Sequence, residues 1–475
     1  NCPYAGGHFD RINDAVFELL TKGPDELSRE VLLAQAHKHR VCPFELSLDT
    51  ASWTDGVICD YNYVFDPNVR LKRFFAEGIK GEYLFLIDEA HNLVERGRQM
   101  YSATLCKEDF LELSRTLKEH SPKLNRLLKQ CNKHLLEYKR ECDTYQVLEN
   151  IGGFSLKLLS LQSEMENFLE KEHEEKIQKA VLDFSFQVRH FLNMYDLTDE
   201  NYVIYTHYGE GGTFLLTLFC VNPRKNLQEC LDKGRGTVFF SGTFLPLAYY
   251  RSLFSMRTDD YAICAASPFP RENLKLIVAR DVSSKYTRRA PEEFQRIAGY
   301  IYQMICGKKG NYLVFFPSYR MMEDVYQAFQ EKTEQEGLQV RCILQSPSMS
   351  EEEREEFLQS FQAEGQVSLA GFCVMGGIFS EGIDLTGEKL IGAAIVGTGL
   401  PQVGSQREIL KEYYDGKGQS GFDYAYRFPG MNKVLQAAGR VIRTKEDRGV
   451  IALLDERFLQ WEYRRLFPRE WEEYT

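Results

Sequence analysis

Six short apolar runs, each ending in polar or glycine-rich residues, constrain the fold of this chain most strongly. They cover residues 83–87, 237–240, 312–316, 372–375, 391–396 and 450–454. Their hydrophobicity is continuous rather than alternating, which is typical of strands buried on both faces of a parallel sheet. In parallel α/β sheets, ligands bind beyond the carboxyl ends of the strands. The sequence therefore predicts an α/β fold whose polar motifs gather along one sheet edge.

Length, cysteine content and net charge limit the class of protein to which this chain can belong. The 475 residues are too many for one hydrophobic core, so two or three domains are expected. No apolar run reaches bilayer-spanning length, which predicts no membrane partner. The 12 scattered cysteines favour a reducing, cytoplasmic location. A net charge of −11 counts against a basic coat for nucleic acid, although it allows a local basic groove.

An acidic motif, Asp88-Glu89-Ala90-His91, directly follows the first apolar run. A magnesium-bound nucleotide needs one carboxylate to hold the metal and one to orient water, and this pair supplies both. We expect Asp88 to hold Mg²⁺, Glu89 to act as the base for ATP hydrolysis, and His91 to relay the nucleotide state to neighbouring loops. The alternative is an ordinary helix start, at which Asp88 caps and Glu89 complements the helix dipole.

A second motif, Gln436 to Arg443, carries the opposite charge. Gln436, Arg440 and Arg443 are spaced by four and three residues, so they share one face if the stretch is helical. Arginines placed this way stabilise the charge that develops on a transferring phosphoryl group. A structural salt-bridge cluster is the alternative. Together with the acidic motif, these residues predict a two-lobed, ATP-driven motor.

Two further motifs follow predicted strands but are weak when taken alone. Ser241 and Thr243 follow the run at 237–240, and Gly382 and Asp384 lie in a loop after the run at 372–375. Such loops can bring backbone amides and a carboxylate near a nucleotide. An ordinary turn is an equally good explanation for the loop that holds Gly382 and Asp384.

A candidate nucleic-acid contact lies at residues 285–289. Tyr286, Arg288 and Arg289 combine an aromatic ring with positive charge, the combination that single-strand binders use. An ordinary surface loop is the alternative.

Residues 105–201 differ in character from the rest of the chain. Glycine is confined to positions 152 and 153, and leucine recurs at helical spacing. The pattern predicts an all-helical insertion between the strand before Asp88 and the strand before Ser241.

Two Cys-Pro pairs, at Cys2 and Cys42, raise the question of a metal site. Two thiols cannot hold a cluster alone, since four ligands are usual for iron–sulfur or zinc. His37 and His39 could complete a zinc site. The residues therefore leave iron–sulfur, zinc and two unrelated core cysteines open.

The ordered set of motifs resembles the XPD/DinG family of superfamily-two DNA helicases, of the bacterial, iron–sulfur-containing type. It comprises Cys2-Pro3-Tyr4, Cys42-Pro43-Phe44, Asp60-Tyr61-Asn62-Tyr63, residues 88–91, 241–243, 380–384 and 436–443. The resemblance implies two RecA-like lobes, a helical arch and an iron–sulfur domain in the first lobe, and ATP-dependent 5′→3′ unwinding of single-stranded or forked DNA in DNA repair. It implies that Cys2 and Cys42 are two of four [4Fe-4S] ligands.

The resemblance also implies a division of the chain. It assigns residues 1–50 to a remnant of the cluster domain, 51–104 and 206–260 to the first lobe, 105–205 to the arch and 261–475 to the second lobe.

The sequence departs from the family in one respect, because it contains no Gly-Lys-Ser/Thr phosphate-binding loop. We expect an N-terminally truncated copy that is inactive alone. A non-hydrolysing nucleic-acid-binding module and an RNA-directed helicase remain the alternatives.

Overall fold

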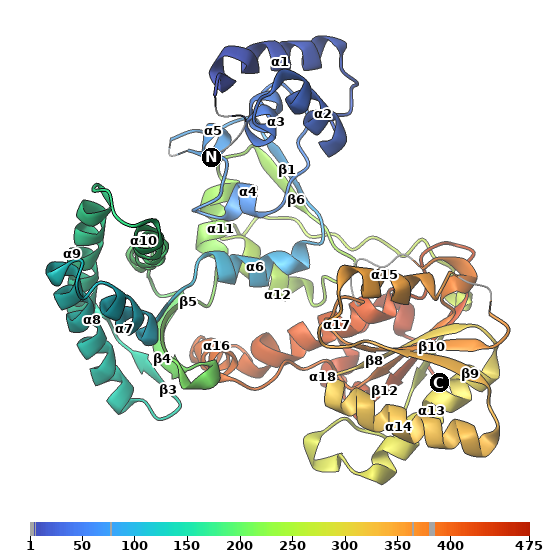
Figure 1. The fold of residues 1–475 in the computed structure, drawn as a ribbon. Coiled ribbons are helices and arrows are strands. Elements are labelled where there is room, and N and C mark those ends of the chain that lie inside the picture. The colour runs from blue at the N-terminus through green and yellow to red at the C-terminus, as the bar shows by residue number, and fades with distance from the viewer. Residues whose placement is uncertain (1–3, 5, 77, 363–364, 380–384) are drawn as a thin grey trace. The chain divides into compact units, whose positions relative to one another are not determined.

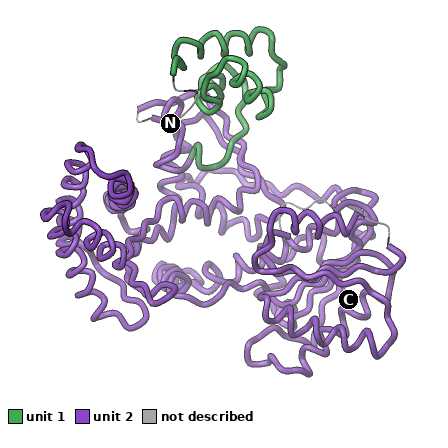
Figure 2. Tube along the Cα trace, viewed as in Figure 1, with its two compact units in different colours: residues 1–64 green, residues 65–475 purple. Residues whose placement is uncertain are grey.

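The computed structural model describes the chain except for residues 1–3, 5, 77, 363–364 and 380–384. The chain divides into two compact units, residues 1–64 and 65–475 (Figure 2). Helix α4 (Asn62–Phe65) spans their boundary. No helix in the described part of the chain is long and apolar enough to cross a membrane.

The first unit is a small helical domain. Its helices are α1 (His8–Lys22), α2 (Arg29–His39) and α3 (Pro43–Ala51). The hydroxyl of Ser28 caps α2 by accepting a hydrogen bond from the Val31 amide, and Pro43 opens α3, where its missing amide hydrogen costs nothing. The unit has its own core, formed by Ile12, Ala15, Val16, Ala36, Val41 and Leu46.

A two-stranded parallel sheet carries the acidic motif in the second unit. Strand β1 (Leu84–Ile87) pairs with β6 (Gly236–Phe239), so Ile87 lies beside Phe239 at the carboxyl ends. The expectation of burial on both faces is wrong here, because Leu84 and Leu86 are 72% and 70% exposed while the alternate residues are buried. The physical reason is that only one face of this small sheet is packed within the described residues.

A six-stranded sheet forms the core of the C-terminal part, and every pairing in it is parallel, as the apolar runs predict (Figure 1). Its strand order is β7-β12-β11-β8-β10-β9. The strands are β7 (Leu274–Val278), β8 (Asn311–Phe316), β9 (Val340–Leu344), β10 (Ser368–Val374), β11 (Gly392–Val396) and β12 (Gly449–Leu454).

Helices pack against this sheet and continue its hydrophobic core. Side chains such as Ile301 and Phe329 on the helices meet Val314 and Phe372 on the strands. Helix α14 begins at a Ser318 cap, and the Ser350 capping box opens α15. The helices of this part are α13 (Pro291–Gly307), α14 (Tyr319–Glu336), α15 (Glu351–Gln359), α16 (Ser405–Gly416), α17 (Phe428–Ala438) and α18 (Trp461–Arg464).

The region expected to be an all-helical insertion also contains a sheet, so that expectation is wrong. Its elements are β2 (Ala103–Cys106), α7 (Lys107–Thr116), α8 (Pro122–Glu141), β3 (Tyr145–Leu148), α9 (Gly152–Leu169), α10 (Glu175–Asp196), β4 (Tyr202–Tyr208) and β5 (Phe214–Cys220). The strands pair antiparallel in the order β2-β5-β4-β3, and α7 and α10 pack against them. The leucine-rich helices dominate the sequence pattern, and the two edge strands have only four residues each, too few to show a strand period.

Shorter helices surround β1 and β6 and connect them to the insertion. They are α5 (Lys72–Phe75), α6 (Leu93–Met100), α11 (Arg224–Leu231) and α12 (Leu247–Phe254). Helix α6 follows the acidic motif directly. The residues that pack against α6 therefore also help to orient the acidic motif.

Candidate functional site

The acidic motif forms a tight turn at the end of β1. Oδ1 of Asp88 accepts a hydrogen bond from the Glu89 amide at 2.7 Å. Glu89 has a left-handed backbone with φ 43°, which is uncommon and strained for a residue other than glycine. The Ala90 amide donates to the carbonyl of Phe240 at 3.2 Å and so ties the turn to the end of β6. These hydrogen bonds hold the turn directly after the carboxyl end of β1.

His91 connects three of the predicted motifs. Its ring is buried, with Nδ1 2.8 Å from Oγ of Ser241 and 3.3 Å from Oε2 of Glu89. On the other side, its Nε2 lies 2.5 Å from Nε2 of Gln436. An amide nitrogen can only donate, so with this amide orientation Nε2 of His91 accepts and Nδ1 carries the proton. The imidazole therefore bridges the strand end after β6 and helix α17.

Ser241 and Thr243 form the second strand end. Oγ of Ser241 accepts a hydrogen bond from the Thr243 amide at 3.1 Å and lies 3.2 Å from Oγ1 of Thr243. Thr243 is buried. The two hydroxyls thus belong to one network with His91, which the isolated sequence motif did not reveal.

The electrostatics of Glu89 keep its carboxylate ionised. The hydrogen bond with His91 lowers the pKa of Glu89, burial opposes that change, and the charge of Arg440 and the hydrogen bond with Ser241 add to it. Its side chain keeps 58% of its surface exposed, so the carboxylate stays ionised and open to a water molecule.

The arginines of the second motif do not lie on a helix face, which corrects the expectation. Helix α17 ends at Ala438, with Gly439 as its C-cap. Gln436 lies in the last turn, whereas Arg440 and Arg443 follow the helix end. The physical reason is that glycine and the β-branched pair after it favour leaving the helix at this point. Arg440 nevertheless lies close enough to Glu89 to lower its pKa.

Asp447, which the sequence gave no reason to single out, holds the segment around Arg443. Its buried carboxylate accepts hydrogen bonds from the amides of Arg443 and Thr444, both at 2.7 Å, and from the Gly387 amide at 3.0 Å. Burial acts to raise the pKa of Asp447, but these hydrogen bonds outweigh it and lower the pKa. A lone aspartate four residues after an arginine is too common a pattern to have predicted this role.

The segment at residues 285–289 contains both a structural and an exposed part. Arg288 makes ion pairs with Glu293 and Glu456, each at 3.0 Å. Tyr286 is 84% exposed, and the Arg289 guanidinium lies 5.7 Å from the centre of its ring. Tyr286 therefore presents an exposed ring beside the Arg289 guanidinium, whereas the charge of Arg288 is already matched by carboxylates.

Several predicted ligands cannot be placed. Cys2, Gly382 and Asp384 lie outside the described residues. Cys42 is described and partly buried, and its amide donates to Nδ1 of His8 at 3.2 Å. Among the described residues, no group of three or more histidine, cysteine, aspartate or glutamate side chains could hold a metal ion. The described residues therefore do not by themselves form an iron–sulfur or zinc site.

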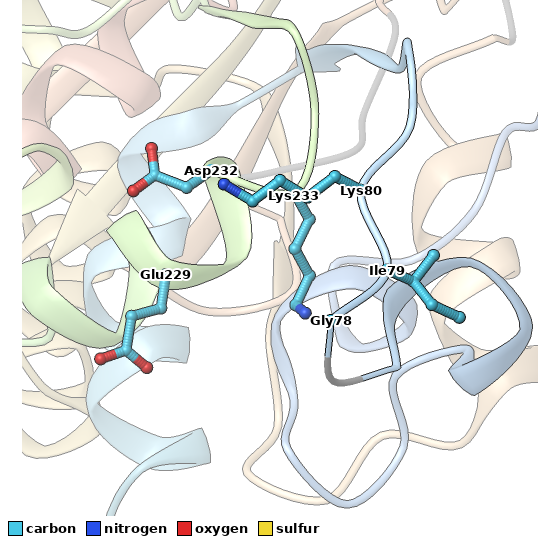
Figure 3. Close-up of a pocket in the computed structure, with 6 residues that line it drawn as sticks. All are labelled: Gly78, Ile79, Lys80, Glu229, Asp232 and Lys233. Atoms are coloured by element: carbon cyan, nitrogen blue, oxygen red, sulfur yellow. The ribbon is translucent and has the colours of Figure 1, made fainter.

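A small surface hollow elsewhere in the second unit contains none of the predicted site residues. It is lined by Gly78, Ile79, Lys80, Glu229, Asp232 and Lys233 (Figure 3). Its two acids and two lysines balance in charge, and Lys233 already donates to the carbonyl of Ala76 at 2.9 Å. The hollow gives no reason to place a nucleotide there.

Comparison with known protein families covers both ends of the chain. A model described as "Helicase C-terminal domain" matches residues 301–474, and the model DEAD_2 matches residues 1–110. The chain is 24% identical over 436 residues to "ATP-dependent DNA helicase XPD" of Sulfolobus acidocaldarius, which covers 89% of this chain and 73% of that protein. The chain belongs to the XPD-type family of superfamily-two helicases.

Other family members extend further than this chain. "ATP-dependent DNA helicase CHL1" of Candida glabrata is 22% identical over 477 residues, which cover 88% of this chain but 56% of that protein. "Probable ATP-dependent helicase MJ0942" of Methanocaldococcus jannaschii is 27% identical over 274 residues, which cover 55% of this chain and 40% of that protein. The chain thus spans between two fifths and three quarters of these three curated relatives.

Solved structures support the fold. A structure titled "XPD_Helicase" matches 98% of this chain and 82% of its own with a TM-score of 0.58 and 19% identity. A structure of Xpd4 from S. tokodaii matches 98% of both chains with a TM-score of 0.58 and 14% identity. The predicted α/β class and the XPD-type resemblance are both confirmed. The two parallel sheets are consistent with two RecA-like lobes.

Proposed function

We propose that this protein is an ATP-dependent DNA helicase whose hydrolytic centre lies where β1 and β6 end. One observation carries the proposal: His91 contacts Glu89 and Ser241 from the first lobe and Gln436 from the second. A motor that converts hydrolysis into lobe movement needs a side chain that contacts both lobes and the catalytic carboxylate. We assign this role to His91. The division of the chain into residues 51–104 and 206–260, 105–205 and 261–475 is part of this proposal.

The acidic turn supplies the chemistry. Glu89, with its lowered pKa, is ionised at neutral pH and accepts a proton from the attacking water. Asp88 lies beside it and would hold Mg²⁺, which neutralises phosphate charge when bound. Arg440, placed near Glu89, and Arg443, held by Asp447 through its backbone, would contact the γ-phosphate from the second lobe.

We infer that single-stranded DNA is the track and that movement is 5′→3′. Two of the relatives are named DNA helicases, and Tyr286 with Arg289 offers a stacking surface for one base. Gly382 and Asp384 are proposed to bring the loop after β10 to the nucleotide.

One specific observation favours a second candidate, a nucleic-acid-binding module that does not hydrolyse ATP. The 475 residues contain no Gly-Lys-Ser/Thr, the sequence that cradles nucleotide phosphates in such motors. Experiments should therefore use the protein as its gene encodes it, together with any residues that precede Asn1.

Steady-state ATP hydrolysis with and without single-stranded DNA tests the first candidate. We expect DNA to stimulate turnover and Glu89→Gln to lower kcat by about 10²-fold or more while ATP binding persists. Glu82→Gln is the matched control, because Glu82 is exposed just before β1 and pairs only at the surface with Arg235. Full activity of Glu89→Gln would contradict the mechanism. Binding of DNA without any hydrolysis by the unaltered protein would favour the second candidate.

Strand displacement resolves the direction and the track. We expect unwinding of duplexes that carry a 5′ single-stranded tail and none with a 3′ tail. Stimulation of ATP hydrolysis by RNA oligonucleotides but not by DNA would replace the DNA track with an RNA track.

We also propose that Cys2 and Cys42 contribute to a [4Fe-4S] cluster, with ligands beyond the described residues. The proposal rests on the XPD-type family alone. A brown protein containing about four irons, which loses them in a Cys42→Ser variant, would support it. A colourless protein that contains zinc would overturn it.

A further inference from the structure

Helix α6, which follows the acidic motif, carries an arginine that is fixed inside the first lobe. Arg98 is 2% exposed, its Nε donates to the carbonyl of Val221 at 2.9 Å, and its Nη1 donates to Oε1 of Glu95 at 3.0 Å. Burial acts to lower the pKa of Arg98, but Glu95 and the hydroxyls of Tyr249 and Tyr414 outweigh it and raise the pKa. A buried guanidinium of this kind holds its carboxylate partner in one position.

The same oxygen of Glu95 also binds the second lobe. Nη1 of Arg407, on α16, donates to Oε1 of Glu95 at 3.2 Å. The Glu95 side chain is 46% exposed, so the partial burial that acts to raise its pKa is modest, and the charges of Arg98 and Arg407 hold the pKa below its ordinary value. Glu95 thus stays ionised and is shared between one arginine from each lobe.

The chain leads from Arg407 directly to the catalytic residues of the second lobe. Helix α16 is followed by a π-helical turn (Asp423–Arg427), which continues without a break into α17 and Gln436. π-Helical turns are rare and occur mostly at functional sites. Tyr249 of α12 packs its ring against Tyr424 in this turn and against Phe428, with centroids 5.1 and 5.0 Å apart. The Glu95 contact therefore lies near the start of α16, the helix that precedes the π-helical turn and α17, and a turn at residues 417–420 separates α16 from them.

Part of this network is left unsatisfied. Within the described part of the chain, Nη2 of Arg98 and the hydroxyl of Tyr414 are both buried, and neither completes a hydrogen bond of good geometry although the two side chains are close enough to interact. Tyr414 lies on α16, close enough to Arg98 to affect its pKa. Buried polar groups with poor hydrogen-bond geometry are costly, so Nη2 of Arg98 and the hydroxyl of Tyr414 are the least satisfied part of this network.

We propose that Glu95 is a positioning residue that couples the acidic motif to the second lobe through Arg98 and Arg407. Glu95 fixes where α16, and hence Gln436, stands relative to His91. This inference rests on the proposed function, since positioning matters only if Glu89 hydrolyses ATP. Glu95 does not touch the reacting atoms.

A double-mutant cycle with two readouts tests the proposal. The variants are Glu95→Gln, Arg407→Gln and the double variant, made in the full-length protein. Lys411→Gln is the matched control, because it removes a charge from α16 whose ion pair with Glu408 stays within that helix. The first readout is the urea unfolding equilibrium without ATP or DNA, and the second is kcat and KM for ATP with saturating single-stranded DNA.

The proposal predicts non-additivity in both readouts. Each single substitution should lower kcat on the order of 10-fold with KM for ATP changed less than about twofold, and the double variant should match the singles. Arg407→Lys, which keeps the charge, should recover part of the loss in kcat.

Additive effects of the two substitutions on the free energy of unfolding would show that Glu95 and Arg407 do not interact. Coupled unfolding with an unchanged kcat would overturn the positioning role. An unaltered protein without ATP hydrolysis would overturn the proposed function, and that result is visible before any variant is made.

Discussion

Nε2 of Gln436 and Nε2 of His91 lie 2.5 Å apart although 345 positions separate the two residues in the chain. The contact joins the last turn of α17 to the acidic turn after β1. Because the imidazole also reaches Ser241 and Glu89 through Nδ1, the position of α17 is transmitted to the proposed catalytic base through one ring.

Removal of the amide at this contact should uncouple the lobes. Gln436→Met keeps the length of the side chain but cannot donate to His91. We expect DNA-stimulated ATP turnover to fall about 30-fold, which corresponds to about 2 kcal/mol for a buried acceptor left without its partner. Steady-state kinetics with saturating DNA measures the effect. Gln419→Met, at an exposed position, is the control, and turnover within twofold of the unaltered protein would contradict the role of Gln436.

The pH profile should report the link between His91 and Glu89. The hydrogen bond from His91 is the largest cause that lowers the pKa of Glu89. A base with a lowered pKa stays active to lower pH, so the acid limb of kcat/KM should lie below the ordinary range for glutamate. In a His91→Ala variant that limb should move to higher pH, because burial is then opposed only by the charge of Arg440 and the hydrogen bond with Ser241.

Comparison with a surface histidine provides the control for this profile. His120→Ala, at an exposed position, should leave the acid limb in place. An acid limb that stays fixed or moves to lower pH in His91→Ala would show that another group titrates.

Strands were predicted from the sequence where the apolar run was long and uninterrupted by polar residues. Strands β8, β10, β11 and β12 are continuous apolar segments in the middle of a parallel sheet, and all four were predicted. Strand β3 has three half-buried residues and one exposed residue, Val147, and the leucine-rich helices on either side of it in the sequence dominate the pattern. The prediction that β1 is buried on both faces was wrong. Hydrophobicity shows which residues can be buried, but it does not show whether a neighbouring layer covers them.

For the site as well, the residues that form a local motif were predicted, and the residues that depend on distant contacts were not. Asp88, Glu89 and His91 form a contiguous motif whose chemistry is evident from the residue types. Asp447 and Glu95 each join near neighbours to one residue far away in sequence, Gly387 for Asp447 and Arg407 for Glu95. Single carboxylates occur throughout this chain, so sequence alone could not select these two. The helix face expected for Arg440 depended on α17 continuing beyond Gly439, which local spacing could not decide.

The exposed ring of Tyr286 should contribute to binding of single-stranded DNA. Stacking of one base on an aromatic side chain contributes about 1–3 kcal/mol, so Tyr286→Ala should weaken binding about 10-fold or more. Fluorescence anisotropy with a labelled oligonucleotide at fixed salt measures the change. Tyr261→Ala removes an equally exposed ring elsewhere and should have no effect. Equal affinity in both variants would remove Tyr286 from the DNA track.

The last prediction concerns the buried pair that supports the Tyr286 segment. Asp455 is fully buried and accepts hydrogen bonds from Ser284, through its amide at 2.8 Å and its hydroxyl at 2.9 Å, and from Arg457. Burial acts to raise the pKa of Asp455, but Arg457 outweighs it and lowers the pKa. Asp455→Asn should therefore lower the free energy of unfolding by about 3 kcal/mol at neutral pH, because it leaves Arg457 without its charge partner.

The sign of the pH dependence follows from the lowered pKa. A carboxylate whose pKa is lower in the folded state stabilises the fold above its unfolded pKa, near 4, and loses that contribution as pH falls through the folded pKa. The difference in unfolding free energy between the unaltered protein and Asp455→Asn should therefore be largest at neutral pH and shrink below about pH 4. Urea unfolding across this range measures it, with Asp259→Asn at an exposed position as the control. A difference that grows on acidification would mean that Asp455 is protonated in the folded protein at neutral pH.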